Sequence, residues 1–221
     1  MAKEIKNENA EAVVEAVSKT EQFFSKNGKK LSIIAGLVVA ATVIIFCWYK
    51  FIYAPEADAA QGNMAYAEEV FRNGDYETAL NGNEEFDGFA QIIDTYGSKA
   101  GESAYLYAGV CELHLKNWEA AINYLEQYNG NDPILEARAT ACIGDAYVGL
   151  EDYEKALGYF ESAAKVIDNA YAADYLLKAG VTAEKLGLTD KALEYYKTIK
   201  EHYTQSPVRY EIEKYIGRLQ K

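Results

Sequence analysis

The longest apolar run in the chain lies near its N-terminal end. Leu31 to Tyr49 are 19 consecutive uncharged, mostly apolar residues, and as a helix they measure about 28 Å, close to the hydrocarbon thickness of a bilayer. A cleavable signal peptide has a shorter apolar region, of roughly 7–15 residues, that begins nearer the N-terminus. Ala57-Asp58-Ala59 resembles a cleavage site and keeps that alternative open. The pattern favours an uncleaved transmembrane anchor over residues 31–53.

The segment before this run has a helical period of its own. Val13, Val17 and Phe24 fall on one side of a helix. Asn27-Gly28 is expected to end that helix, because both residues are common at helix C-termini. We expect residues 1–30 to hold a short amphipathic helix that lies on the membrane face, with a specific docking element as the alternative.

Small residues recur with one period beyond the apolar run. Two sets are spaced by 35 and 36 residues: Gly109, Gly144 and Gly180, and Ala121, Ala156 and Ala192. Each alanine follows its glycine by 12 residues. Two independent markers that keep one period indicate a repeat array.

The clearest unit shows why small residues recur. It contains Gly144-x2-Tyr147 and then Ala156-x3-Phe160-x2-Ala163. Small residues allow two helices to cross closely, and large residues fill the space beside the crossing. This unit resembles the tetratricopeptide repeat, whose pattern is W-x2-L-G-x2-Y followed by A-x3-F and P.

That resemblance implies an all-α fold. We expect a right-handed tetratricopeptide-repeat α-solenoid of about four helix pairs plus a C-terminal capping helix, preceded by the single transmembrane helix. Its expected parts are a divergent first repeat at 58–97, repeats at 102–133, 137–168 and 173–204, and the cap helix at 207–220. Pro55 is expected to break the helix just past the membrane.

Lysines are distributed unevenly around the apolar run. Lys19, Lys26, Lys29 and Lys30 precede it, and only Lys50 follows it closely. The positive-inside rule therefore places the N-terminus in the cytoplasm and the repeat domain outside.

Charge divides the chain at the same place. The net charge is −12; residues 1–53 carry 7 basic and 5 acidic side chains (net +2), and residues 54–221 carry 15 and 29 (net −14). Nucleic acid and anionic lipid both repel such an acidic domain, which argues against a nucleic-acid binder and against a peripheral protein that relies on anionic lipid. Half of the 221 residues are apolar, so a substantial core can form.

Small residues also line one face of the predicted span. Ser32, Gly36 and Ala40 are spaced by four residues, and this spacing lets another helix approach closely. A contact with another membrane protein is the functional interpretation, and chance is the alternative because apolar spans are rich in glycine and alanine.

Patterns that carry catalysis are missing from the sequence. The two histidines belong to no cluster with metal-ligand spacing, and phosphate-binding glycine loops, G-x-S-x-G and H-E-x-x-H are absent. Cys111 and Cys142 lie on neighbouring first helices and are expected to be free buried thiols, since a disulfide needs favourable Cβ vectors. We predict a non-enzymatic protein without metal, cofactor or small-molecule substrate. An enzyme whose site is built from unrecognised residues is the remaining alternative.

A binding surface has more support than an active site. The first helix of each repeat lines the concave face of such arrays, and nine positions share the side turned about 100° from the packing residues. They are Leu106, Val110, Leu113, Ala141, Asp145, Val148, Leu177, Val181 and Glu184. Seven are apolar, which suits an apolar extended or helical segment or a partner's helix, unless these residues pack neighbouring helices instead. The Lys and Asn with which some tetratricopeptide domains grip C-terminal carboxylates are absent from this stripe.

The layout of the whole chain is similar to the YfgM-like family, the ancillary subunit of the bacterial Sec translocon. The shared stretches are Phe23-Phe24-x2-Asn27-Gly28-Lys29, Ala65-Tyr66-Ala67 and Tyr96-Gly97. The resemblance implies a single-pass protein of the inner membrane of a Gram-negative bacterium, with residues 54–221 in the periplasm. It also implies a role in passing translocated chains to folding factors.

The partners that the resemblance implies are proteins: Sec translocon subunits, periplasmic chaperones or other envelope proteins. A scaffold of another envelope machine, for outer-membrane assembly, secretion or cell-wall synthesis, has the same architecture and is the alternative. A mitochondrial import receptor with an N-terminal anchor is a further one, and it would place the repeats in the cytosol.

Overall fold

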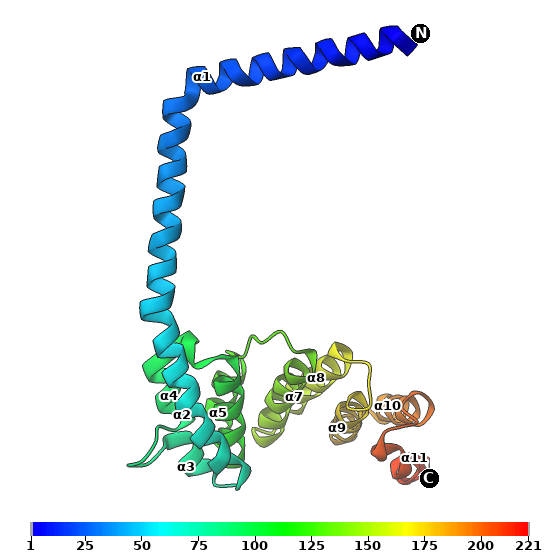
Figure 1. Ribbon diagram of the computed structural model, residues 1–221. Coiled ribbons are helices and arrows are strands. Elements are labelled where there is room, and N and C mark those ends of the chain that lie inside the picture. The colour runs from blue at the N-terminus through cyan, green and yellow to red at the C-terminus, as the bar shows by residue number, and fades with distance from the viewer. Residues whose placement is uncertain (1, 221) are drawn as a thin grey trace. The chain divides into compact units, whose positions relative to one another are not determined.

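The computed structural model describes the backbone of residues 2–220 and the side chains of Ser18, residues 21–23 and residues 25–220. Every regular element in that part of the chain is helical. The chain divides into two compact units, Met1–Pro55 and Glu56–Lys221. The expectation of an all-helical protein with one apolar N-terminal helix and a tetratricopeptide-like solenoid is confirmed (Figure 1).

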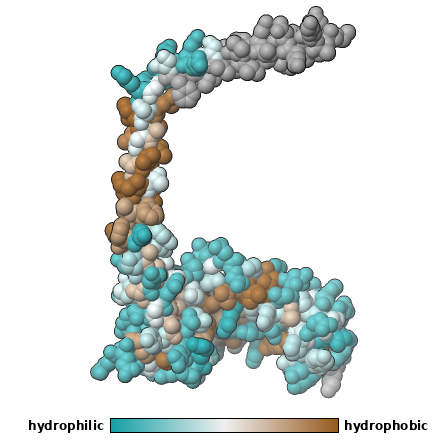
Figure 2. Space-filling view, in the orientation of Figure 1, coloured by the Kyte–Doolittle hydropathy of each residue, from teal (hydrophilic) through white to brown (hydrophobic). Residues whose placement is uncertain are grey.

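The first unit is dominated by helix α1 (Ala2–Trp48). Its apolar run is exposed within the unit; Ile44 and Leu37, for example, are 68% and 66% exposed, and Figure 2 shows this run as a brown band. The helical stretch Ser25–Arg72 is long and apolar enough to cross a membrane by length and composition, and none of its most apolar window is buried. Val13, Val17 and Phe24, the apolar side of the predicted amphipathic helix, lie outside the described side chains.

The predicted helix end at Asn27-Gly28 is wrong, because α1 continues through both residues. The Asn27 side chain donates a hydrogen bond to the Phe23 carbonyl at 3.1 Å, one turn back in the same helix. A glycine inside a helix costs only about 1 kcal/mol, and helix propagation from the apolar run outweighs that amount.

The predicted break at Pro55 is also wrong. A short π-helix, η1 (Tyr49–Tyr53), leads directly into α2 (Ala54–Arg72), and the Ala54 N–H donates to the Tyr49 carbonyl five residues back. Proline has no N–H and its ring crowds the carbonyl four residues before it. The backbone accommodates Pro55 by widening one turn into a π-bulge.

The second unit is a solenoid of stacked helix pairs. After α2 its helices are α3 (Tyr76–Asn81), α4 (Phe89–Tyr96), η2 (Gly97–Ala100), α5 (Glu102–His114), α6 (Trp118–Leu125), α7 (Pro133–Gly149), α8 (Tyr153–Val166), α9 (Ala172–Lys185), α10 (Thr189–His202), η3 (Pro207–Tyr210) and α11 (Ile212–Leu219). Repeat 1 is α2 with α3, and repeats 2, 3 and 4 are α5/α6, α7/α8 and α9/α10. Helix α4 is an addition to repeat 1, and α11 packs on α10 at the end of the array.

All four repeats turn through the same backbone conformation. Gly74, Lys116, Glu151 and Gly187 have positive φ angles of 83°, 64°, 60° and 73°. The N–H of the next residue then donates to the carbonyl five residues back, as in Asp152 to Tyr147 and Leu188 to Ala183, both at 2.9 Å. This is the bonding of a Schellman motif, which ends one helix and starts the chain toward the next. Repeat 1 shares it, although its sequence departs from the repeat pattern.

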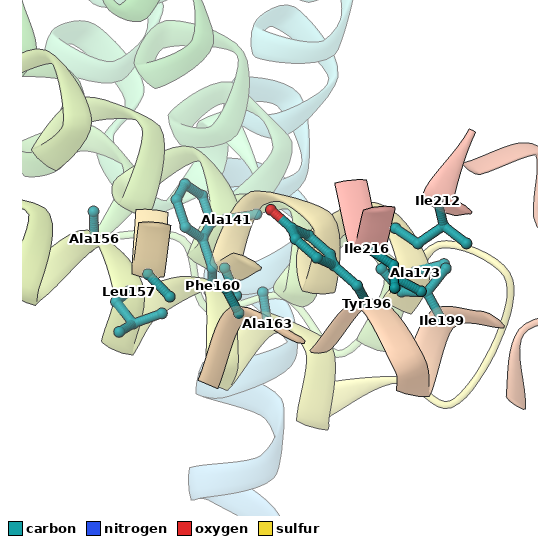
Figure 3. Close-up of a cluster of buried hydrophobic side chains, with 13 residues drawn as sticks. Ala141, Ala156, Leu157, Phe160, Ala163, Ala173, Tyr196, Ile199, Ile212 and Ile216 are labelled. Atoms are coloured by element: carbon teal, nitrogen blue, oxygen red, sulfur yellow. The ribbon is translucent and has the colours of Figure 1, made fainter. Parts of the chain in front are cut away.

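The periodic glycines lie beneath a large side chain of the second helix. A Cβ on Gly109, Gly144 or Gly180 would lie 2.5 Å from Leu125 Cγ, 2.6 Å from Phe160 Cε1 or 2.3 Å from Tyr196 Cε1. In each pair the large residue follows its glycine by 16 positions. Phe160 and Tyr196 belong to one buried cluster that also includes Ala156, Ala163 and Ala192 (Figure 3). The period of small residues thus follows from a helix crossing too close for a Cβ atom.

Candidate binding groove

The nine residues of the predicted concave stripe do not share one environment. Leu106, Val110 and Ala141 are buried, at 5%, 6% and 2% exposure. Val148 and Val181 are partly open, at 37% and 38%. The first three therefore pack between neighbouring helices, which is the alternative that the sequence left open.

Three more residues of the stripe, Leu113, Asp145 and Leu177, are half-buried. Glu184 is tied to the C-terminal end of the array. It accepts hydrogen bonds from the Tyr196 hydroxyl and from Arg218, the latter at 2.6 Å. This hydrogen bonding gives Glu184 a structural role.

A groove of about 610 Å³ opens on the first helices of repeats 2, 3 and 4. Helix α7 contributes residues from its middle, α5 with the start of α6 lies on one side, and α9 lies on the other. The lining residues are Val110, Leu113, His114, Trp118, Arg138, Ala141, Cys142, Asp145, Tyr171, Asp174, Tyr175 and Lys178. The volume is within the range of sites that bury a small ligand or a few side chains.

The two sides of the groove differ in polarity. Val110, Leu113 and Trp118 make the side of repeat 2 apolar. On the side of repeat 4, Lys178 Nζ donates to Asp145 Oδ1 at 2.8 Å and so joins α9 to α7. Arg138 is exposed, and among residues 56–220 it forms no ion pair. The arrangement suits a segment with one apolar face and one polar face.

Burial shifts the titration of two acidic groups in the groove. It raises the pKa of the Cys142 thiol to about 11, so the thiol is neutral at pH 7. It also raises the pKa of Asp174, and the Lys178 ammonium partly opposes that shift. A neutral thiol is a poor nucleophile.

The thiol of Cys111, on the neighbouring helix α5, also has a raised pKa. Burial raises the pKa of Cys111 to about 12, and Cys111 and Cys142 are both free cysteines. Both thiols are therefore neutral at pH 7. No group of three or more His, Cys, Asp or Glu that could hold a metal ion occurs among the described residues.

The predicted stripe contains four of the twelve groove residues, Val110, Leu113, Ala141 and Asp145, and sequence reasoning missed the other eight. Arg138 and Asp174 are equivalent positions 36 residues apart, and so are Cys142 and Lys178. These columns lie one turn from the predicted stripe on the same helices. The 35- and 36-residue period could have grouped them, but the helix crossing decides which column faces the groove.

The small residues of the predicted span face away from every other helix in the described part of the chain. Ser32, Gly36 and Ala40 are exposed, and a Cβ on Gly36 would meet no atom within 4 Å. The Ser32 hydroxyl donates to the Lys29 carbonyl of its own helix at 2.9 Å. Their role as a helix contact stays a prediction.

Comparison with known proteins identifies the repeats. Two models of the tetratricopeptide repeat match the chain, over residues 103–133 and over residues 143–207. A curated relative, the 43 kDa receptor-associated protein of the synapse of Gallus gallus, is 34% identical over 76 residues. These residues are 34% of this chain but 18% of that protein, so the chain matches less than a fifth of its length.

Solved structures share the solenoid. Two crystal structures of MamA match with TM-scores of 0.52 and 0.53 at 18% and 19% identity. The matches cover 70% and 73% of this chain and 92% and 86% of the MamA chains. The likeness shows the fold, and with the family models it confirms the tetratricopeptide resemblance. The narrower resemblance to the Sec-associated family stays a prediction.

Proposed function

We propose that this chain is a membrane-anchored scaffold that holds a protein segment in the groove between α5, α7 and α9. Tetratricopeptide repeats are protein-interaction modules, and the groove is the observation that carries the proposal. Its apolar side, formed by Val110, Leu113 and Trp118, receives apolar side chains of the segment. Its polar side offers Arg138 and the phenols of Tyr171 and Tyr175 for hydrogen bonds.

The proposed anchor is α1, which crosses the membrane once. The lysines before the apolar run keep the N-terminus in the cytoplasm, so the solenoid lies on the opposite side. In a bacterial inner membrane that side is the periplasm. Protease added to spheroplasts should then digest the repeat domain and spare the N-terminal segment; the opposite pattern would reverse the orientation.

The proposed partner machine is the Sec translocon. Support comes from the resemblance of the membrane-proximal stretches to the YfgM-like family. In this role the solenoid links translocated chains to periplasmic chaperones, and the Ser32–Gly36–Ala40 face contacts another membrane helix. A scaffold of a different envelope machine is the competing outcome of the same experiment.

The test is purification of the tagged full-length protein from native membranes in mild detergent, followed by mass spectrometry. Translocon subunits or periplasmic chaperones should be enriched over a variant in which an unrelated span replaces residues 31–53. Enrichment of outer-membrane or cell-wall assembly proteins without the translocon would instead favour the competing scaffold.

A matched pair of tyrosine variants tests the groove. Tyr171, 55% exposed, lines the groove, whereas Tyr210, 82% exposed, lies outside it in η3. Tyr171→Ala should reduce the recovery of partners several-fold, because aromatic anchors carry much of an interface's binding energy. Tyr210→Ala should leave recovery unchanged. Equal recovery with both variants would place the interaction outside the groove.

A further inference from the structure

Polar side-chain contacts link repeat 3, repeat 4 and the C-terminal cap. Each joins a carboxylate to a donor 30 to 35 residues later in the chain. The pairs are Asp145 with Lys178, Glu161 with Lys191 and Tyr195, Asp168 with Tyr203, and Glu184 with Arg218. We call this set the polar ladder. Hydrogen bonds depend on direction, so the ladder restricts rotation of one repeat against the next.

Aromatic rings link repeat 1 to repeat 2. The ring of Tyr107 on α5 lies 5.0 Å from Phe71 and 5.2 Å from Phe89, measured between centroids. His114 stacks on Tyr76 at 3.7 Å with an interplanar angle of 5°. Ring contacts of this kind also prefer particular geometries.

The junction between repeats 2 and 3 has neither kind of link. Among residues 56–220, no side-chain hydrogen bond, ion pair or ring–ring contact joins α5 or α6 to α7 or α8. A hydrophobic cluster holds this junction; its buried members, such as Leu106, Ile122 and Ile143, are aliphatic, and rings such as Trp118 and Tyr147 pack against them. Apolar burial has no preferred direction, so it tolerates sliding better than the ladder does.

The second helix of repeat 2 is also short. Helix α6 has 8 residues, whereas α8 and α10 have 14 each. At 1.5 Å per residue α6 measures about 12 Å, and the 17-residue α7 beside it about 25 Å. Helix α6 is therefore about half as long as the α7 helix that packs against it.

The groove spans this junction. Val110, Leu113 and Trp118 belong to repeat 2, whereas Asp145 and Lys178 belong to repeats 3 and 4 and are joined by the ladder. A rotation at the junction would move one side of the groove against the other while α7 and α9 stay together.

We infer that the junction between repeats 2 and 3 is a joint in the solenoid and that rotation there changes the width of the groove. A protein segment in the groove then selects the orientation of repeat 2 against repeats 3 and 4. This last step rests on the proposed binding role of the groove; the joint itself does not.

Three equivalent exposed positions allow a matched test. Glu119, Glu154 and Asp190 are each the second residue of the second helix in repeats 2, 3 and 4. Spin labels at Glu119→Cys with Glu154→Cys span the joint, and labels at Glu154→Cys with Asp190→Cys span the ladder. The full-length chain with Cys47→Ser and Cys142→Ser is used in nanodiscs, because Cys47 is exposed and Cys142 is partly exposed in the groove, whereas Cys111 is buried.

Electron–electron resonance should give a distance distribution roughly twice as wide across the joint as across the ladder. The double variant Glu161→Gln with Lys178→Met should widen the second distribution toward the first, because these changes remove ladder contacts. Circular dichroism checks that the total helix content of the variant is unchanged. The inference would be overturned if the two label pairs gave equally wide distributions in the chain with an intact ladder. It would also be overturned if the double variant left the width of the Glu154–Asp190 distribution unchanged. Because no partner is present, this outcome is independent of whether the groove binds one.

Discussion

The junction between repeats 3 and 4 and the junction between repeats 2 and 3 both join equivalent helix pairs, but different interactions hold them together. Between repeats 3 and 4, Glu161 and Asp145 accept hydrogen bonds from the following repeat, and Phe160 and Tyr196 share a buried cluster. Between repeats 2 and 3 the contact is apolar, with an aliphatic core and the Trp118 ring against Gly149. A repeat pattern thus specifies how each pair of helices packs internally, while the residues between repeats decide how firmly neighbouring pairs are held.

The largest expected effect on stability comes from the buried cluster of repeats 3 and 4. Phe160→Ala should lower the free energy of unfolding by about 4 kcal/mol, since Phe160 is 1% exposed and fills the space over Gly144. Phe160→Leu is the control, because repeat 2 has Leu125 at the equivalent position, and it should cost about 1 kcal/mol. Urea unfolding of the full chain in detergent measures both. If the two variants lost similar amounts of unfolding free energy, the structure around position 160 would have closed in to fill the cavity left by the ring.

An added methyl group at the other junction should have a smaller effect. A Cβ on Gly149 would lie 2.4 Å from the Trp118 ring, so we expect Gly149→Ala to lower stability by about 1–3 kcal/mol. Gly158→Ala is the matched control in α8, where a Cβ meets nothing within 4 Å, and it should raise stability by about 0.5–1 kcal/mol. Hydrogen exchange locates the change. Loss of protection in α9 and α10 but not in α6 and α7 would contradict a contact local to the joint.

The polar ladder should contribute less than the packed core and depend on pH. Burial alone would raise the pKa of Glu161, but hydrogen bonds from Lys191 and Tyr195 outweigh burial and lower it. Glu161→Gln should therefore destabilise the chain by about 1 kcal/mol at pH 7, a figure kept small by partial solvent exposure.

The sign of the pH effect follows from the lowered pKa. A carboxyl group whose pKa is lower when folded stabilises the fold above its unfolded value, about 4.3, and loses that contribution as pH falls through the folded value. The melting temperatures of the original chain and Glu161→Gln should converge below that window. If the difference in melting temperature were as large in acid as at pH 7, the variant would act through the shape of the side chain and not through its charge.

The smallest effect is expected at Asp174 in the groove. Its raised pKa means that the ionised carboxylate is disfavoured in the folded chain at pH 7. Asp174→Asn should raise stability by a few tenths of a kcal/mol at neutral pH, about the size of an exposed charge effect. The gain should vanish once the pH falls below the unfolded pKa, where both side chains are neutral. Paired melting curves at pH 7 and pH 3 provide the measurement, and a loss at pH 7 would show that Asp174 stabilises through a hydrogen bond.

Particular residues show how far sequence analysis reaches. The period of Gly109, Gly144 and Gly180 predicted the solenoid because each repeat needs the same close crossing. It could not predict that Arg138 and Lys178 line the groove, since both lie one turn from the predicted stripe. Pro55 failed as a helix breaker because a single π-turn accommodates its ring.

By itself, the sequence determined the apolar helix over residues 31–49 and the repeating helix pairs, because both depend on residues that are near one another or recur at a fixed interval. Only the tertiary structure decided which residues form the groove and which junctions carry polar links. Those features depend on the helix crossing and on partners 30 to 35 residues apart, such as Asp145 and Lys178, which folding brings within hydrogen-bond distance.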